Sequence, residues 1–371
     1  MDNNSYAIDQ AACRGRQQRL LAQMETLGVE LVLLTRNESV QWLTGAYVGP
    51  IFAPVAALDA AGHVTLVLPS RQVSTDVAAD EIVGYEEKWH STIRDEQRAA
   101  SNEVLLHAVS NRPGRVGGEW SCLGPRLLAE FGSDMVNIEP TLFCLRRRKD
   151  SDELRMLERA NDANRVMYAL AREIVQPGIS ELEVYCQLHA AAVNKLGETL
   201  TYFGQDFQCC SRGGPPRDRK AQAGELYILD LGVGFRGYYS DNCRTIAVGG
   251  EVTDLQQEAW ESLEKVFPLV ESTVRPGASC RQLFNKVQAL LDDCGPGIFN
   301  HHLGHGVGLA PHEGPHLNPH WDDTFELGNY FTVEPGLYHK DLRHGIRLEE
   351  NYVVTEDGVE RMQIGDLGMR K

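Results

Sequence analysis

The feature that most constrains the fold of this chain is an internal repeat. Residues 174–184, IVQPGISELEV, and residues 273–283, TVRPGASCRQL, share one pattern at an offset of 99 residues. In each copy a long amphipathic helix is predicted to end, Pro-Gly turns the chain, and a serine caps the next helix. Ser180 and Glu183 have the spacing of a capping box. β-rich sequence follows each pair of helices, so the repeat predicts an α+β domain with approximate two-fold symmetry and a cleft between its halves.

A second, smaller domain is predicted ahead of the repeat, because 371 residues exceed what one ordinary hydrophobic core holds. Helical and strand-like apolar patterns alternate up to about residue 140, which indicates an α/β domain. Its clearest predicted elements are a helix over 11–27 and buried strands over 29–34 and 64–69. The basic run RRRK, residues 146–149, is interpreted as a solvated linker. The expected domains are therefore 1–145 and 146–371.

Charge and cysteine usage narrow the partners and the location. A formal net charge of -16 repels phosphate backbones and anionic lipid, so we expect neither nucleic acid nor a membrane as a partner. The N-terminus is polar, without the apolar core of a signal peptide, and no stretch approaches the ~20 apolar residues of a membrane span. The nine cysteines are scattered without CxxC spacing, which is typical of free thiols in a reducing compartment. We therefore expect a cytoplasmic protein.

Two aspartates, Asp230 and Asp241, are predicted to lie side by side. Asp230 stands within apolar strand sequence, where a lone ionised carboxylate carries a large desolvation cost. The glycine-rich stretch 232–237 can turn the chain back as a hairpin and bring Asp241 next to Asp230. Two like charges held together repel, and a bound metal ion removes that penalty. The structural alternative is a pair of hydrogen-bonded turn aspartates.

Four histidines lie within twelve residues of one glycine-rich segment, HHLGHGVGLAPHE: His301, His302, His305 and His312. Neutral imidazole is a ligand for zinc, iron, manganese or cobalt. The glycines around His305 let the backbone pack closely, so we expect its side chain to project into a crowded centre. A single histidine would more often be a surface or core residue, but this density among glycines favours a functional site.

Two glutamates also stand in strand-like apolar sequence, Glu334 in YFTVEPGLY and Glu349 in HGIRLEENYVV. Arg347 is a possible structural partner for one buried glutamate. Together with the aspartates and His305, however, these carboxylates suit a pair of divalent metal ions. Two such ions ~3.5–4 Å apart can share a hydroxide and polarise a carbonyl oxygen, so the predicted chemistry is metal-assisted hydrolysis.

These motifs, over roughly residues 150–371, resemble the pita-bread metallopeptidase family, which includes methionine aminopeptidase, X-Pro aminopeptidase and prolidase. The resemblance covers all five ligand positions in order: Asp230, Asp241, His305, Glu334 and Glu349. Residues 1–145 resemble the N-terminal domain of prolidase, X-Pro aminopeptidase and creatinase through ESVQWLTG and the two-domain length. The resemblance implies a C-terminal pita-bread catalytic domain with a creatinase-like α/β domain ahead of it, in the proline-specific branch.

The resemblance also implies a metal-binding role for each of these five residues. Asp230 would chelate one metal ion, while Asp241 and Glu349 would bridge both ions. His305 and Glu334 would complete the second ion. Manganese, cobalt, zinc and iron all tolerate this ligand set, and manganese is favoured.

Further roles follow from the same resemblance. Glu334 would accept the proton of the attacking water, and His312 would contact the substrate carbonyl or the tetrahedral intermediate. His301 matches a position implicated in proton relay and substrate binding. Arg347 would brace the site or meet a substrate carboxylate. A homodimer is expected, since two-domain relatives often complete the active site with a neighbour's N-terminal domain.

One loop, CCSRGGPPRDRKAQAG, departs from the family pattern. Proline-specific relatives usually carry a histidine where this chain has Gly213 and Gly214, and that histidine contacts substrate near the scissile bond. His301, His302 or His316 could substitute for it. Two substrate hypotheses therefore remain open: an X-Pro dipeptide or peptide cleaved before proline, or a small non-peptide amide, amidine or guanidino metabolite, as in creatinase- or ectoine-hydrolase-like enzymes. A metal-binding pseudoenzyme is a third alternative.

Overall fold

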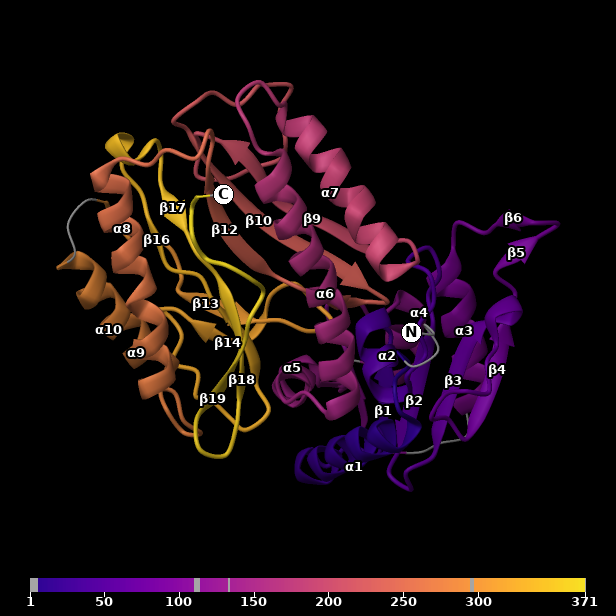
Figure 1. The fold of residues 1–371 in the computed structure, drawn as a ribbon. Coiled ribbons are helices and arrows are strands. Elements are labelled where there is room, and N and C mark those ends of the chain that lie inside the picture. Colours follow the sequence, from indigo (N-terminus) through magenta and orange to yellow (C-terminus); the bar gives the residue numbers. More distant parts are fainter. Residues whose placement is uncertain (1–5, 110–113, 133, 294–296, 371) are drawn as a thin grey trace. The chain divides into compact units, whose positions relative to one another are not determined.

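The computed structural model of the protein describes residues 6–109, 114–132, 134–293 and 297–370 (Figure 1). The chain divides into two compact units. One extends over Ala7–Arg146, and the other contains the chain from Arg147 onward together with Tyr6. Among the described residues, no helix combines the length and the apolar character needed to cross a membrane.

The N-terminal unit is an α/β unit built on one mixed six-stranded sheet of order β4-β3-β2-β1-β7-β8. Neighbouring strands are parallel in the pairs β1–β7, β7–β8 and β3–β4, and antiparallel in the others. The helices and strands of this unit are α1 Gln10–Leu27, β1 Leu31–Leu34, α2 Asn37–Thr44, β2 Val55–Asp59, β3 Val64–Pro69, the 3-10 helix η2 Ser70–Gln72, β4 Glu81–Tyr85, β5 Lys88–Trp89, β6 Thr92–Ile93, α3 Gln97–Val109, β7 Val116–Gly118, α4 Pro125–Phe131, β8 Val136–Asn137 and α5 Glu139–Arg147.

The predicted N-terminal elements are confirmed with small shifts at their ends. Helix α1 begins one residue before the predicted 11–27, because Asp9 caps it by accepting a hydrogen bond from the amide of Ala11. It ends at Gly28, which adopts the left-handed conformation that a glycine tolerates best. The predicted strand 64–69 is β3, while the predicted strand 29–34 begins later, at Leu31.

The C-terminal unit holds two sheets flanked by helices. One has the order β11-β10-β12, with β9 on the free side of β10, and the other has the order β14-β13-β15-β18-β19. Its elements are α6 Ser151–Ile174, α7 Glu181–Leu196, β9 Tyr202–Cys209, β10 Leu226–Phe235, β11 Tyr238–Tyr239, β12 Asn242–Ala247, α8 Asp254–Glu264, α9 Val266–Thr273, α10 Cys280–Asp292, β13 Gly304–Gly306, β14 Glu313–Leu317, β15 Tyr330–Val333, β16 Gly336–Leu337, the 3-10 helix η3 Lys340–Leu342, β17 Ile346–Arg347, β18 Glu350–Val354 and β19 Val359–Met362.

The internal repeat corresponds to two helix–turn–helix units. Ser180 caps α7 by accepting from the amide of Glu183 at 3.0 Å, and Ser279 caps α10 by accepting from the amide of Gln282 at 3.1 Å. Helix α6 packs on β10, whereas α10 packs on β14, so each sheet receives one copy (Figure 1). The long helix expected before the second turn is divided into α8 and α9 at Lys265. Pro268 explains the division, because it has no amide hydrogen to continue the helical ladder.

The basic run 146–149 is not a solvated linker, and that prediction is wrong. Arg147 and Lys149 are buried. Arg147 Nη2 donates to the carbonyl oxygen of Thr324 at 2.7 Å, and Lys149 Nζ donates to Glu313 Oε2 at 3.0 Å. Arg148 keeps a side chain that is 56% exposed. The partners of the buried cations lie more than 160 residues downstream, which is why local charge pattern did not reveal them.

Candidate metal centre

The two aspartates come from one antiparallel strand pair. β10 pairs with β12 so that Asp230 lies opposite Cys243. Asp241 precedes Cys243 by two residues, so both carboxylates fall on the same face of the sheet. The expected hairpin is present, but most of the stretch 232–237 belongs to β10 and only residues 236 and 237 turn the chain. Gly232 instead permits close strand packing, since a Cβ there would lie 2.7 Å from the carbonyl oxygen of Ser240.

His305 lies at the centre of the short strand β13, between two glycines that admit neighbouring backbone. A Cβ on Gly304 would lie 2.0 Å from the carbonyl oxygen of Thr332, and one on Gly306 would lie 2.0 Å from that of Gly314. Real Cβ atoms do not approach so closely, so a larger residue at either position would displace the strand. The expectation that glycines let His305 project into a crowded centre is confirmed, because the residue is only 3% exposed.

The two glutamates meet at the end of the β15–β18 ladder. Val333 lies opposite Glu350 in this antiparallel pair. Glu334 is the next residue after Val333, and Glu349 is the residue before Glu350, so the ladder brings the two carboxylates together. Both are buried, at 7% and 1% exposure.

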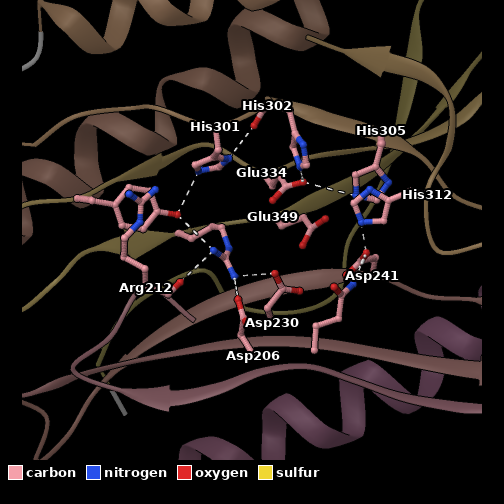
Figure 2. Close-up of a pocket in the computed structure, with 13 residues that line it drawn as sticks. Asp206, Arg212, Asp230, Asp241, His301, His302, His305, His312, Glu334 and Glu349 are labelled. Carbon is pink, nitrogen blue, oxygen red and sulfur yellow. Dashed lines mark hydrogen bonds and ion pairs between the residues drawn. The ribbon is translucent and has the colours of Figure 1, made fainter. Parts of the chain in front are cut away.

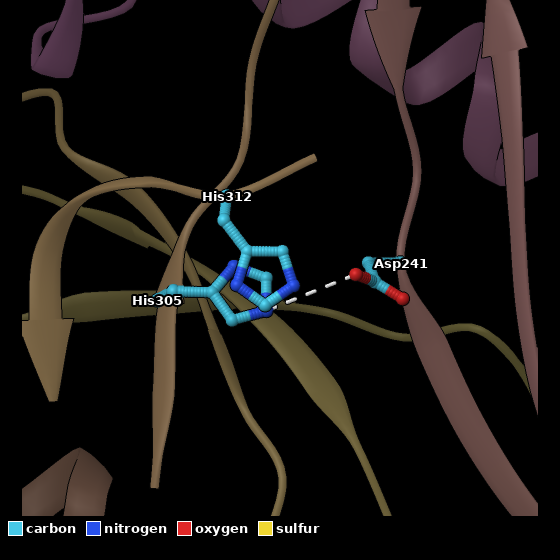
Figure 3. A group of neighbouring side chains, drawn as sticks. All are labelled: Asp241, His305 and His312. Atoms are coloured by element: carbon cyan, nitrogen blue, oxygen red, sulfur yellow. Dashed lines mark ion pairs between the residues drawn. The ribbon is translucent and has the colours of Figure 1, made fainter. Parts of the chain in front are cut away.

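The five predicted ligands line one pocket with about 610 Å³ of empty volume, together with His301, His302, His312 and Arg347 (Figure 2). Two groups within it offer ligand atoms that lie within 4.8 Å of one another: Asp230, Asp241 and Glu349, and His305, Glu334 and Glu349. Glu349 belongs to both groups, so the five residues form two adjoining sites rather than one. A third group of the same kind is Asp241, His305 and His312 (Figure 3).

Burial makes it costly to hold these carboxylates together in their ionised form unless a cation lies between them. It raises the pKa of Asp230 to about 6, although the charge of Arg347 opposes the change. Burial, followed by the charges of Glu349 and Asp230, raises the pKa of Asp241 well above its usual value. Burial, followed by the charges of Asp230 and Glu334, does the same to Glu349.

One oxygen of each of these three carboxylates also has no hydrogen-bond donor. Among the described residues, Asp230 Oδ1, Asp241 Oδ1 and Glu349 Oε2 are buried without a partner. Buried polar oxygens normally have a donor or a metal ion. The donor set therefore fits divalent cations, which would satisfy all three oxygens and remove the repulsion.

The imidazole of His305 is oriented for coordination. Its Nδ1 lies 3.0 Å from the carbonyl oxygen of Gly306, and donation there leaves the Nε2 lone pair free. Nε2 lies 3.5 Å from Glu334 Oε1 and 3.8 Å from Asp241 Oδ2. Burial lowers the pKa of His305 to about 4, so the ring is neutral near pH 7, as a metal ligand must be.

His302, rather than His301, contacts Glu334. His302 Nε2 lies 2.6 Å from Glu334 Oε1. Burial would raise the pKa of Glu334, but this hydrogen bond and the charges of His302, His305 and Arg347 outweigh it and hold the pKa at about 2. His301 instead binds the hydroxyl of Tyr338 through Nε2 at 3.1 Å and the carbonyl oxygen of His302 through Nδ1 at 2.7 Å. The sequence named His302 only as a possible substitute for the missing loop histidine.

His312 stacks on His305, with ring centroids 3.6 Å apart and planes at 13°, and it lines the pocket (Figure 3). The neighbouring Glu313 fixes the backbone at this point. Its Oε2 accepts from Lys149 Nζ at 3.0 Å and its Oε1 accepts from the amide of Ala310 at 3.2 Å. The Lys149–Glu313 pair is almost fully buried and therefore acts as a brace for His312.

Replacement of Lys149 by methionine is expected to lower kcat/KM about 10-fold without changing metal content, because Glu313 loses its partner and His312 shifts. A buried charge left without its partner is also expected to lower the free energy of unfolding by about 3 kcal/mol. Steady-state kinetics and denaturant unfolding measure the two effects. Arg148→Met removes the neighbouring exposed cation and serves as the control. Equal behaviour of the two variants would contradict the bracing role.

Arg347 is held between two carboxylates. Its Nη2 donates to Asp230 Oδ2 at 2.8 Å and also to Asp206, while its Nη1 donates to the hydroxyl of Tyr338 at 3.3 Å. These contacts engage both terminal nitrogens of Arg347 with groups of the protein. The sequence did not identify Asp206, whose only signal is its place in β9 directly opposite Asp230.

Asp206 also occupies the space beside the two loop glycines. A Cβ on Gly213 would lie 2.1 Å from Asp206 Oδ2, and the amide of Gly214 donates to Asp206 Oδ1 at 2.6 Å. A histidine at position 213 would collide with this carboxylate. The departure of the loop from the family pattern thus has a structural counterpart, in which an Asp206–Arg347 pair lies where a histidine side chain would need room.

Comparison with known proteins settles the family. The profile of metallopeptidase family M24 matches residues 155–356, more than half of the chain. This chain belongs to metallopeptidase family M24. Residues 16–135 match the creatinase/prolidase N-terminal domain, so the predicted two-domain resemblance is confirmed. Membership of M24 makes the protein a metal-dependent hydrolase that uses divalent metal ions.

Individual relatives are similar to this M24 chain along most of its length, in sequence and in structure. The Xaa-Pro dipeptidase of Pyrococcus horikoshii is 29% identical over 354 residues, which cover 93% of this chain and 95% of that protein. The Xaa-Pro dipeptidase of Lactobacillus delbrueckii subsp. lactis is 26% identical over 344 residues, covering 89% and 92%. The solved structure of an Xaa-Pro dipeptidase from Bacillus anthracis matches with a TM-score of 0.81 at 23% identity, covering 96% of this chain and 99% of its own. This likeness confirms the predicted pita-bread fold.

Proposed function

We propose that this protein is a two-metal Xaa-Pro peptidase that releases the N-terminal residue before proline. The observation that carries the proposal is the pair of adjoining clusters of possible metal ligands that share Glu349. Among the described residues, three buried carboxylate oxygens in these clusters lack a hydrogen-bond donor. The Xaa-Pro dipeptidases among its relatives support the choice of peptide substrate.

The residues that would hold the two ions are Asp230, Asp241, His305, Glu334 and Glu349. Asp241 lies between the two groups, because its Oδ2 is 3.8 Å from the Nε2 of His305 and its carboxylate also belongs to the Asp230 group. Four carboxylates and one imidazole favour a hard or borderline ion, and we propose manganese. When bound, the ions supply a nucleophile from water at neutral pH and polarise the substrate carbonyl.

The chain's own residues then provide proton transfer and orientation. Glu334 is ionised and is proposed to accept the proton of the attacking water, while His302 Nε2, which donates to Oε1 at 2.6 Å, orients its carboxylate. His312 lines the pocket and is proposed to donate to the carbonyl oxygen as negative charge develops there. His301 acts with the hydroxyl of Tyr338, 3.1 Å away, as a second polar contact for substrate.

A small non-peptide amide remains the second candidate, and the specific observation that favours it is Asp206 beside Gly213. An acidic group in place of a histidine would suit a cationic guanidino or amidine compound better than a peptide carbonyl. Arg347 weakens this alternative, because it already neutralises Asp206 in the structure.

We expect protein loaded with Mn²⁺ to hydrolyse Xaa-Pro dipeptides, and chelation followed by Mn²⁺, Co²⁺ or Zn²⁺ addition to abolish and restore that activity. A panel of Xaa-Pro dipeptides, longer Xaa-Pro peptides, Xaa-Ala dipeptides and small amides or guanidino compounds tests this, with metal content measured on each sample. Turnover of small amides but not of Xaa-Pro peptides would replace the first candidate by the second. Failure to bind metal would favour the pseudoenzyme.

We further propose that the protein is a cytoplasmic homodimer. The location is supported by the nine scattered cysteines, which lack CxxC spacing. Light scattering of the purified protein measures its oligomeric state, and a monomer would refute the dimer.

A further inference from the structure

Two arginines line the pocket, Arg347 and Arg212, and they differ in whether carboxylates compensate their positive charge. Arg347 donates to Asp206 and Asp230, and its other terminal nitrogen donates to Tyr338 and to the backbone oxygen of Arg212. Two carboxylates therefore compensate its charge, and both terminal nitrogens are engaged. A substrate anion has little to gain from Arg347, which leaves the second arginine as the candidate.

Arg212 has only neutral partners within the described parts of the chain. Its Nη2 donates to the amide oxygen of Asn300 at 2.6 Å, and its guanidinium lies 4.0 Å from the ring centroid of Tyr338. Neighbouring arginines of the same loop behave differently, since Arg217 and Arg219 form ion pairs with Glu181 and Glu225. The loop thus pairs two of these three arginines with acids and leaves Arg212, which is exposed, with an uncompensated positive charge.

The Asp206–Arg347 pair, which leaves no room for a histidine at position 213, also fixes the position of Arg212. Its carbonyl oxygen accepts from Arg347 Nη1 at 3.2 Å, and Asp206 holds the following glycines through the amide of Gly214. The ring of Tyr338 supports its guanidinium from one side. Both the backbone and the head group are therefore held at the pocket before any ligand arrives, which reduces the entropy lost on binding.

Figure 2 shows Arg212 on the opposite side of the pocket from Asp241, His305 and His312. A substrate whose scissile carbonyl lies at the carboxylate cluster can extend toward Arg212 with its leaving end. An extended dipeptide spans about 7 Å, at about 3.3–3.6 Å per residue. A terminal carboxylate is the anion that such a short substrate offers, and an arginine fork binds carboxylates in a bidentate manner.

We propose that Arg212 binds the free C-terminal carboxylate of the substrate and so makes the protein a dipeptidase rather than an aminopeptidase acting on longer chains. This inference rests on the proposed function and deepens it by naming the substrate class. Arg212 would give this loop a substrate contact on the leaving-group side, apart from the scissile bond. It acts on binding, and the metal ligands remain untouched when it is replaced.

The test compares an Xaa-Pro dipeptide with its C-terminal amide on Mn²⁺-loaded wild type, Arg212→Met and Arg343→Met. The two substrates differ only in the terminal charge. Arg343 is exposed, belongs to the same unit and does not line the pocket, so its variant is the matched control. Metal content and thermal midpoint are measured on every sample to show that each variant is folded and loaded.

Wild type and Arg343→Met are expected to prefer the free acid about 10- to 100-fold in kcat/KM, mainly through KM, as a charge-assisted contact provides. In Arg212→Met the preference is expected to fall to about 1, through loss on the acid and unchanged turnover of the amide. Equal loss on both substrates, or hydrolysis of both by wild type without preference, would overturn the inference alone. Failure of wild type to hydrolyse either substrate would overturn the proposed function and this inference with it.

Discussion

The Asp241→Asn variant is expected to lose activity and gain stability in the metal-free state. Asp241 belongs to the ligand group with Asp230 and Glu349 and also to the group with His305 and His312, and within the described parts of the chain its Oδ1 is buried without a donor. Without a metal ion, its charge is desolvated and faces Glu349 and Asp230, which together raise its pKa well above the usual value. Asparagine removes that charge and still offers an oxygen to Gln205, whose Nε2 donates to Asp241 Oδ2 at 3.0 Å. Repulsion should therefore fall while packing is retained.

The loss of activity follows from the loss of the bridging charge. Metal binding lowers the pKa of a bound water from 15.7 to roughly 7, and a centre that no longer holds both ions forfeits most of that effect. We expect kcat/KM to fall on the order of 1,000-fold or more, with less than the wild-type metal content. Kinetics, elemental analysis and thermal unfolding with and without chelator measure these effects. Asp357→Asn, an exposed aspartate, is the control.

The same carboxylates give the metal-free protein a characteristic pH dependence. Burial raises the folded-state pKa of Asp230 to about 6 and raises the pKa values of Asp241 and Glu349 well above their usual values, whereas these groups titrate near 4 in an unfolded chain. Between the unfolded and folded values the folded state binds more protons, so stability falls as pH rises from about 4 through about 6. Metal should cancel this slope, and Asp241→Asn should reduce it. A metal-free variant less stable than metal-free wild type at pH 7 would contradict the account.

The sequence revealed the parts of the site whose chemistry conflicts with their surroundings. Asp230 in an apolar strand and His305 among glycines are conspicuous because a buried charge or a crowded imidazole needs a reason. Strand pairing explains why such residues meet, since the β15–β18 register places Glu334 beside Glu349. The approximate two-fold fold was equally visible, because Pro-Gly turns and serine caps are local signals.

Residues that act through distant partners were not visible in the same way. Nothing in the local sequence distinguishes Asp206 from other strand aspartates. Its role depends on the pairing of β9 with β10 and on Arg347, which is 141 residues away in the sequence. The sequence predicts a solvated Lys149, because its partner Glu313 is 164 residues downstream and leaves no sign in the local sequence. The sequence could not show that His302 contacts Glu334, because that contact depends on the direction of the His302 side chain in the folded protein. Local pattern identified the proposed ligands, and tertiary contacts identified what holds them.

Arg347→Met tests how much of the site depends on one such contact. Methionine has similar length but no charge, so Asp206 and Asp230 would lose their shared partner while remaining largely buried. Breaking a buried pair by removing one side costs about 3–5 kcal/mol of unfolding free energy. The orientation of Asp230 should also relax, and loss of such a supporting contact lowers metal affinity or activity about 10- to 100-fold. Denaturant unfolding and metal titration measure the two effects.

A second substitution separates the charge of Arg347 from its shape. In Arg347→Met/Asp206→Asn the orphaned carboxylate is gone, so most of the lost stability should return, because Asp230 can be compensated by bound metal and Asp206 cannot. Arg347→Lys should fall between wild type and methionine, since one ammonium cannot reach Asp206, Asp230 and Tyr338 together as a planar fork does. If the double variant were as unstable as Arg347→Met, packing rather than charge would explain the loss. If Arg347→Met kept wild-type metal affinity, the Arg347–Asp230 contact would be structural and the metal site would be held by its strands alone.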